Sequence, residues 1–151
     1  TMALTHPEVI RGIVLVGTGA KLKVFPMILE GIKNNFEETI RQITRFAYSR
    51  KASPHLIEKG ISDMMRCRPE VLYGDFLACD RFDLLSEVEK IDFPSLILCG
   101  EEDELTPPKY SQYLQNRIKG SKLETFPHAG HMVMMESPEA FNERIKEFIR
   151  D

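Results

Sequence analysis

The chain has 151 residues, of which 42% are hydrophobic, and this length and composition suit one globular domain with its own core. Its 20 basic and 23 acidic residues give a formal net charge of −3, which argues against a nucleic-acid partner. No apolar run approaches the roughly 18 residues that a membrane span needs, so we expect no membrane partner.

The first predicted elements are the end of a helix and a buried strand. Residues 1–6 have the pattern of the last turns of a helix that stops before Pro7. Residues 10–16 are rich in β-branched side chains and are followed by Gly-Thr-Gly at 17–19, which predicts a buried strand that ends in a loop. A helix that runs directly into a buried strand is half of a βαβ unit, and we expect the strand before this helix to lie outside the sequence.

Apolar residues recur at helical spacing from about residue 24 onward. Phe36, Ile40, Ile43 and Ala47 lie three to four residues apart. Further helices are predicted to start after the N-cap Ser53 and at Pro69, and a short helix is predicted over 84–91. About 70 residues of helix are far more than one crossover between two strands needs. We therefore expect residues 21–91 to form a helical cap that is inserted into an α/β sheet.

Strand and helix alternate again after Pro94. The predicted elements are a strand over 95–99, a helix from the N-cap Thr106 to about residue 118, a strand over 123–126, and an amphipathic helix after Ser137. Such alternation is typical of a parallel sheet, so the predicted fold class is α/β with flanking helices and an inserted cap. The expected division is a helix end and core strand over 1–20, the cap over 21–91, and the C-terminal core over 92–151.

Two loops that follow predicted strands carry titratable side chains. Asp103 lies in the loop after residues 95–99, and His131 lies in the loop after residues 123–126. Functional side chains in open parallel sheets lie beyond the carboxyl ends of the strands, so we expect these two to meet. A carboxylate that orients a histidine, which in turn accepts a proton from a nucleophile, forms the acid and base of a catalytic triad.

Other roles stay open for the residues of these two loops. Asp103 could be a turn residue that caps the loop before Thr106, with Glu102 as the alternative acid. His128 is the rival base, but it has no glycine before it and suits a solvated loop position. His128 and His131 are not expected to bind a metal ion, because no further set of ligands accompanies them.

The spacing of these motifs resembles that of the α/β-hydrolase family. The matching positions are Gly100, Asp103, Thr106 and Pro107 in the acid loop, and Gly130, His131, Glu136 and Pro138 in the histidine segment. The helix end before Pro7 and the strand over 10–16 resemble the stretch after that family's nucleophile helix, and the helical segment falls where the family carries its cap. The resemblance covers the whole chain but roughly the last 55–60% of the family's domain, since such sheets need ~200–250 residues.

The resemblance implies a serine hydrolase that acts on a carboxylic ester or a related small apolar substrate, with Asp103 as acid, His131 as base and no cofactor. The family's Gly-x-Ser-x-Gly nucleophile elbow is absent from this sequence. The fragment that comes nearest contains Ser62, but it lies in a helical pattern without the second glycine, so Ser62 is not expected to be the nucleophile. The loop for the oxyanion hole is missing too. We expect the nucleophile upstream and this chain to be inactive by itself.

The same framework serves other chemistry, because a fold does not determine a function. An aspartate nucleophile would give a dehalogenase or an epoxide hydrolase, and C–C bond hydrolases and cofactor-free haloperoxidases share these C-terminal motifs. A small-ligand-binding module without catalysis is a further alternative. The residue at the elbow would distinguish the enzymes.

The first strand and the cysteines suggest a partner and a compartment. An unpaired edge of the strand over 10–16 invites pairing, so we expect an oligomer or a complex with the missing N-terminal half. Cys67, Cys79 and Cys99 are too scattered for a disulfide framework or a zinc site, and free thiols are typical of a reducing, cytoplasmic compartment. Cys99, at a strand end, is expected to be a buried thiol and not a nucleophile.

Overall fold

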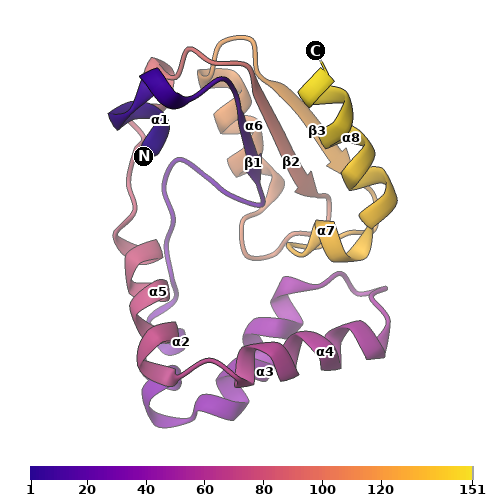
Figure 1. Ribbon diagram of the computed structural model, residues 1–151. Helices are drawn as coiled ribbons and strands as arrows, with labels where there is room; N and C mark the ends of the chain where they lie inside the picture. The colour runs from indigo at the N-terminus through magenta and orange to yellow at the C-terminus, as the bar shows by residue number, and fades with distance from the viewer. Residues whose placement is uncertain (151) are drawn as a thin grey trace.

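A parallel three-stranded sheet lies at the centre of the structure, a computed structural model that describes residues 1–150 (Figure 1). The strands are β1 (Ile13–Val16), β2 (Ser95–Gly100) and β3 (Lys122–Phe126), and they lie side by side in that order. The register places Ile13 beside Ser95, and Leu96 beside Lys122. This arrangement confirms the predicted α/β fold with a parallel sheet and flanking helices.

Helices cover both faces of the sheet, because successive strand residues point to opposite sides. Ile97 packs in an apolar cluster with Leu114 and Ile118, on the face of α6 (Pro108–Arg117). Its neighbour Leu98 packs in a second cluster with Phe141, on the face of α8 (Pro138–Arg150). Burial on both faces explains the apolar run over 96–99 in β2, a strand whose six residues are all buried.

β1 is shorter and less buried than predicted. The strand expected over 10–16 begins at Ile13, whose N–H donates to the carbonyl of Pro94 at 3.0 Å. The ladder cannot start earlier, because its partner β2 begins only after this proline. All four residues of β1 are half-buried, since within residues 1–150 the strand has a neighbour on one side only.

Four helices lie beyond the carboxyl ends of the strands, toward which the arrowheads in Figure 1 point. They are α2 (Pro26–Asn34), α3 (Phe36–Ala47), α4 (Pro54–Met65) and α5 (Pro69–Arg81). They have their own apolar core, which is made by Ile28, Ile32, Ile40, Ile43, Ile61 and Leu72. The division into cap and core at residues 20 and 91 remains a prediction.

The two chain segments that lead into and out of these helices lie side by side. The N–H of Leu22 donates to the carbonyl of Phe82 at 3.1 Å, and the N–H of Leu84 donates to the carbonyl of Ala20 at 2.7 Å. Lys21 and Asp83 add an ion pair at 2.5 Å. The paired segments connect the helical group to the sheet at one end.

Several helix boundaries differ from the prediction. The short helix expected over 84–91 is a turn followed by a 3₁₀ helix, η2 (Val88–Lys90), and α6 begins at Pro108 and not after a Thr106 cap. The N-cap position of α6 is Pro107, and the N–H and hydroxyl of Thr106 donate to Asp103 in the preceding turn. The remaining short elements are α1 (Met2–Thr5), η1 (Pro7–Val9) and α7 (Val133–Glu136). None of the helices in residues 1–150 is long and apolar enough to span a lipid bilayer.

Candidate active site

The loops after β2 and β3 are joined by backbone hydrogen bonds. The N–H of Glu101 donates to the carbonyl of Phe126 at 3.0 Å, and the N–H of Glu102 donates to the carbonyl of Ala129 at 2.9 Å. The carboxyl ends of neighbouring parallel strands meet at one edge of the sheet, and these bonds hold the acid loop against the histidine loop.

Asp103 and His131 meet at this edge. The carboxylate Oδ2 of Asp103 lies 2.9 Å from Nδ1 of His131. The Asp103 side chain has no exposed surface, whereas that of His131 is 27% exposed. Because an ionised carboxylate can only accept, this contact assigns the proton to Nδ1 and leaves a lone pair on Nε2. Within residues 1–150, Nε2 has no hydrogen-bond partner.

Asp103 also closes the turn in which it lies. Its Oδ1 accepts from the N–H groups of Leu105, at 2.9 Å, and Thr106, at 2.8 Å. The Thr106 hydroxyl donates to Oδ2 at 2.9 Å and its oxygen lies 3.2 Å from Nδ1 of His131. The two predicted roles of Asp103, turn residue and partner of His131, are therefore compatible, because the backbone N–H groups of the turn bond to Oδ1 and the imidazole bonds to Oδ2.

Thr106 is a site residue whose contact the sequence reasoning did not predict. The spacing of three residues from Asp103 is the signal that could have revealed it, since short polar side chains often bond to backbone N–H groups two or three residues on. The same spacing places the Thr106 hydroxyl beside the shared Oδ2. The Thr106 hydroxyl and Nδ1 of His131 thus both bond to Oδ2 of Asp103.

β1 contributes a glycine to the site. Gly17 follows the strand, has a φ of +48°, and leaves so little space that an added Cβ would lie 3.1 Å from Nδ1 of His131. A side chain at this position would therefore meet the imidazole. The sequence marked Gly17 as the end of a strand but gave no sign of this contact.

The rival residues lie elsewhere in the two loops. Glu102 Oε1 lies 3.6 Å from Nδ1 of the exposed His128, and Glu102 Oε2 accepts from the N–H of Arg50 at 3.2 Å. Neither residue contacts the Asp103–His131 pair through a hydrogen bond. In the part of the chain that the structure describes, no group of three His, Cys, Asp or Glu side chains is arranged to hold a metal ion.

Neither Cys99 nor Ser62 is placed as a nucleophile for His131. Cys99 is fully buried in β2, and burial raises the pKa of its thiol. Ser62 is an exposed residue of α4 and has no hydrogen bond to His131.

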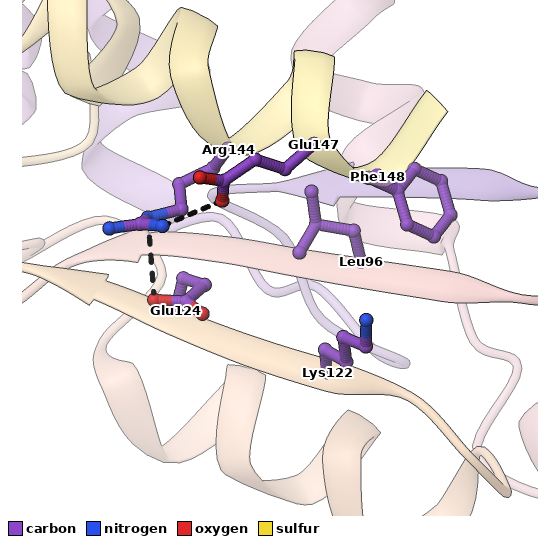
Figure 2. Close-up of a pocket in the computed structure, with 6 residues that line it drawn as sticks. All are labelled: Leu96, Lys122, Glu124, Arg144, Glu147 and Phe148. Carbon is purple, nitrogen blue, oxygen red and sulfur yellow. Dashed lines mark hydrogen bonds and ion pairs between the residues drawn. The ribbon is translucent and has the colours of Figure 1, made fainter. Parts of the chain in front are cut away.

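One cavity lies beside the candidate site, at the carboxyl edge of the sheet, and another lies away from it. A cavity of about 440 Å³ adjoins the acid loop and is lined by Arg50, Lys51, Glu101, Glu102, Asp103 and Glu104. Figure 2 shows the other, of about 290 Å³, which lies between α8 and the sheet. There Arg144 pairs with Glu124 at 3.8 Å and with Glu147 at 2.6 Å, so its charge is already neutralised. The second cavity touches the first residue of β3 and lies away from the candidate site.

Comparison with known proteins gives consistent relatives. A family model described as alpha/beta hydrolase fold matches residues 1–138. The pimeloyl-[acyl-carrier protein] methyl ester esterase of Neisseria meningitidis serogroup B is 26% identical over 98% of this chain and 63% of its own length. The 3-oxoadipate enol-lactonase 2 of Acinetobacter baylyi is 24% identical over 96% of this chain and 57% of its own length.

Solved structures agree in fold. A thermophilic esterase superimposes with a TM-score of 0.90 and 38% identity, over 99% of this chain and 60% of the esterase. The chain thus spans less than two thirds of the length of these relatives.

Proposed function

The chain belongs to the α/β-hydrolase family, and from this premise we propose that Asp103 and His131 are the acid and the base of a catalytic triad in an ester hydrolase. The observation that carries the proposal is the contact of 2.9 Å between the buried carboxylate and Nδ1 of His131. It leaves Nε2, on the other side of the ring, available to accept a proton.

The proposed nucleophile is a serine outside the 151 residues. His131 Nε2 would take the proton from the serine hydroxyl as its oxygen attacks the carbonyl carbon of the ester. The imidazolium would then give this proton to the leaving alkoxide, and an acyl-enzyme would remain. In the second half, Nε2 would take a proton from a water molecule as its oxygen attacks the acyl carbon. The imidazolium would give this proton to the departing serine oxygen, which would release the acid and restore the serine and the neutral histidine. Asp103 would hold the tautomer and stabilise the imidazolium, and no cofactor takes part.

The class of substrate is proposed from the relatives. A methyl ester esterase and an enol-lactonase both cleave a bond between an acyl carbon and an oxygen, in an open or a cyclic ester. A carboxylic ester or lactone with a small apolar acyl group is the substrate class that fits both. The residue at the elbow decides between this reaction and those of aspartate-dependent relatives, because an aspartate nucleophile would form an ester with the substrate's carbon.

The test is steady-state hydrolysis of p-nitrophenyl esters by the protein that contains both this chain and the nucleophile. We expect His131→Gln to lower kcat by about a thousandfold or more, since the base would be lost. His128→Gln is the matched control, because this exposed histidine of the same loop contacts Glu102 and Lys51 but not Asp103. A His131→Gln variant that keeps wild-type kcat would overturn the proposal.

The location of the nucleophile has a separate readout. We expect a fluorophosphonate probe, which labels activated serines, to leave the 17.4 kDa chain unmodified in intact-mass spectrometry. If a second polypeptide is present, it should carry the label. A label on the 17.4 kDa chain itself would show that the nucleophile lies within it.

A further inference from the structure

Glu136 joins the histidine loop to a segment from the other half of the chain. Glu136 ends α7, which lies between the sheet and the helices α3 and α4 (Figure 1). Its Oε1 accepts from the N–H of Gly130 at 2.8 Å, and its Oε2 accepts from the N–H of Ser49 at 2.9 Å, across 87 residues. One carboxylate therefore holds both the residue before His131 and the chain that follows α3.

The segment after α3 packs tightly against the histidine loop. Gly130 has no space for a side chain, since an added Cβ would lie 2.7 Å from the backbone nitrogen of Ser49 and 2.8 Å from the carbonyl carbon of Tyr48. On the other side of His131, the N–H of Met132 donates to the carbonyl of Ala47 at 3.0 Å. The residues on both sides of His131 thus contact residues 47–49, Met132 by a hydrogen bond and Gly130 by close backbone packing.

The same segment also reaches the acid loop. The N–H of Arg50 donates to Oε2 of Glu102 at 3.2 Å, and Glu102 precedes Asp103. Residues 47–50 therefore contact the two loops that carry the candidate acid and base. A displacement of this segment would act on both members of the pair.

The negative charge of Glu136 is held by backbone N–H groups. Within residues 1–150 no cation pairs with it, and its two hydrogen bonds to Gly130 and Ser49 are short and charge-assisted. Together with burial, which is the larger cause, the Glu136 carboxylate raises the pKa of Tyr48. A glutamine could accept from only one of the two N–H groups, because its amide NH₂ would face the other.

We propose that Glu136 is a positioning residue for His131. It fixes the backbone at Gly130 to the segment over 47–50, so that the imidazole keeps its place against Asp103. The predicted effect on kinetics rests on the proposed function, whereas the predicted effect on the Asp103–His131 contact does not.

The experiment compares Glu136→Gln with Glu139→Gln, in the protein that contains the nucleophile. Glu139 is an exposed glutamate in the first turn of the next helix, α8. The first readout is hydrolysis of p-nitrophenyl butyrate: we expect Glu136→Gln to lower kcat by about ten- to a hundredfold, as small misplacements of a catalytic group do. KM should stay within about twofold, because Glu136 does not touch the substrate.

The second readout is independent of activity. An imidazole proton that is shared with a carboxylate gives a downfield proton resonance, which reports the Nδ1–Asp103 contact directly. We expect this resonance to weaken or shift in Glu136→Gln and to be retained in Glu139→Gln. Exchange of the Gly130 amide should become about tenfold faster, since it loses its acceptor.

The outcomes separate this inference from the proposed function. A fall in kcat together with a changed resonance supports a positioning role. A variant that is less stable but keeps both kcat and the resonance would overturn it. A wild-type protein without ester hydrolysis would count against the proposed function alone, and the resonance would still decide on Glu136. If Glu136→Gln does not fold, Glu136→Asp, which keeps the charge but is too short to reach both N–H groups, is measured in the same way.

Discussion

At the scale of single residues, the candidate site depends on the hydrogen bonds that the buried carboxylate of Asp103 accepts. A buried carboxylate is costly unless its oxygens accept hydrogen bonds. Asp103 accepts four, from the N–H groups of Leu105 and Thr106, the Thr106 hydroxyl and Nδ1 of His131. The bonds of the turn therefore fix the position of the carboxylate independently of His131. The close approach of Gly17 limits where the imidazole can lie.

Gly17 allows a prediction at this scale. Gly17→Ala should lower the free energy of unfolding by about 1–2 kcal/mol for the left-handed backbone conformation, with a further loss from the contact between Cβ and the His131 ring. The measurement is urea unfolding together with ester hydrolysis by the complete protein.

Two other glycines serve as controls for this variant. Gly120 has a φ of +73° with no atom within 4 Å of an added Cβ. Gly120→Ala should therefore lower the free energy of unfolding only by the contribution of the left-handed backbone conformation, and it should leave hydrolysis unchanged. Gly74 lies inside α5, also with open space, and Gly74→Ala should stabilise by about 0.5–1 kcal/mol. Equal effects at Gly17 and Gly120 on both stability and hydrolysis would contradict a steric role for Gly17.

At the scale of elements, the helices α2–α5 are held to the rest of the chain at two places. One is the pair of antiparallel segments around Leu22 and Phe82, and the other is the contact of residues 47–50 with the two loops of the candidate site. The helices themselves are maintained by their own apolar cluster and by local signals at their ends. Substitutions at the ends of these helices should therefore change the stability of α2–α5 without a direct effect on the Asp103–His131 pair.

The N-cap of α4 tests this separation. Ser53 Oγ accepts from the N–H of Leu56 at 3.3 Å, so Ser53→Ala should lower the free energy of unfolding by about 1 kcal/mol. Ser62→Ala, within the same helix and exposed, should raise it by a few tenths of a kcal/mol, because alanine is the better helix former. Both variants are measured by thermal unfolding. A loss of ester hydrolysis in Ser62→Ala would contradict its placement away from the site.

At the scale of the whole molecule, β1 is the feature that bears on assembly. Within residues 1–150 its outer edge has no partner strand, and its four apolar residues are only half-buried. An unprotected edge with apolar side chains favours pairing with another strand. The proposed partner is a second copy of this chain or a polypeptide that supplies the rest of the sheet and the nucleophile.

Light scattering coupled to size exclusion tests the assembly. We expect the 151-residue chain to elute as a dimer or larger species, or in complex with a second polypeptide, because pairing would cover the edge of β1. A monomer that stays stable as its concentration is raised would contradict this prediction. Addition of the polypeptide that carries the nucleophile should convert a self-associated form into a mixed complex.

The sequence by itself determined the order of the elements and predicted the two principal residues of the candidate site. Apolar periodicity and the residues that begin and end helices and strands predicted most elements to within a few residues. The exceptions are residues 84–91, which form a turn and a 3₁₀ helix, and the short helix α7, which was not predicted. The rule that active groups lie beyond the carboxyl ends of parallel strands predicted that Asp103 and His131 would meet. Both kinds of signal are local, since they depend on backbone preferences and on the loop that follows a strand.

Tertiary structure alone decided the contacts between segments that are far apart in the chain. The close approach of Gly17 to His131 and the bonds from Glu136 to Gly130 and Ser49 leave no periodic or local pattern, because each depends on how separate elements pack. The half-burial of β1 has the same origin: apolar residues show that a strand can be buried, whereas the number of neighbouring strands determines whether it is.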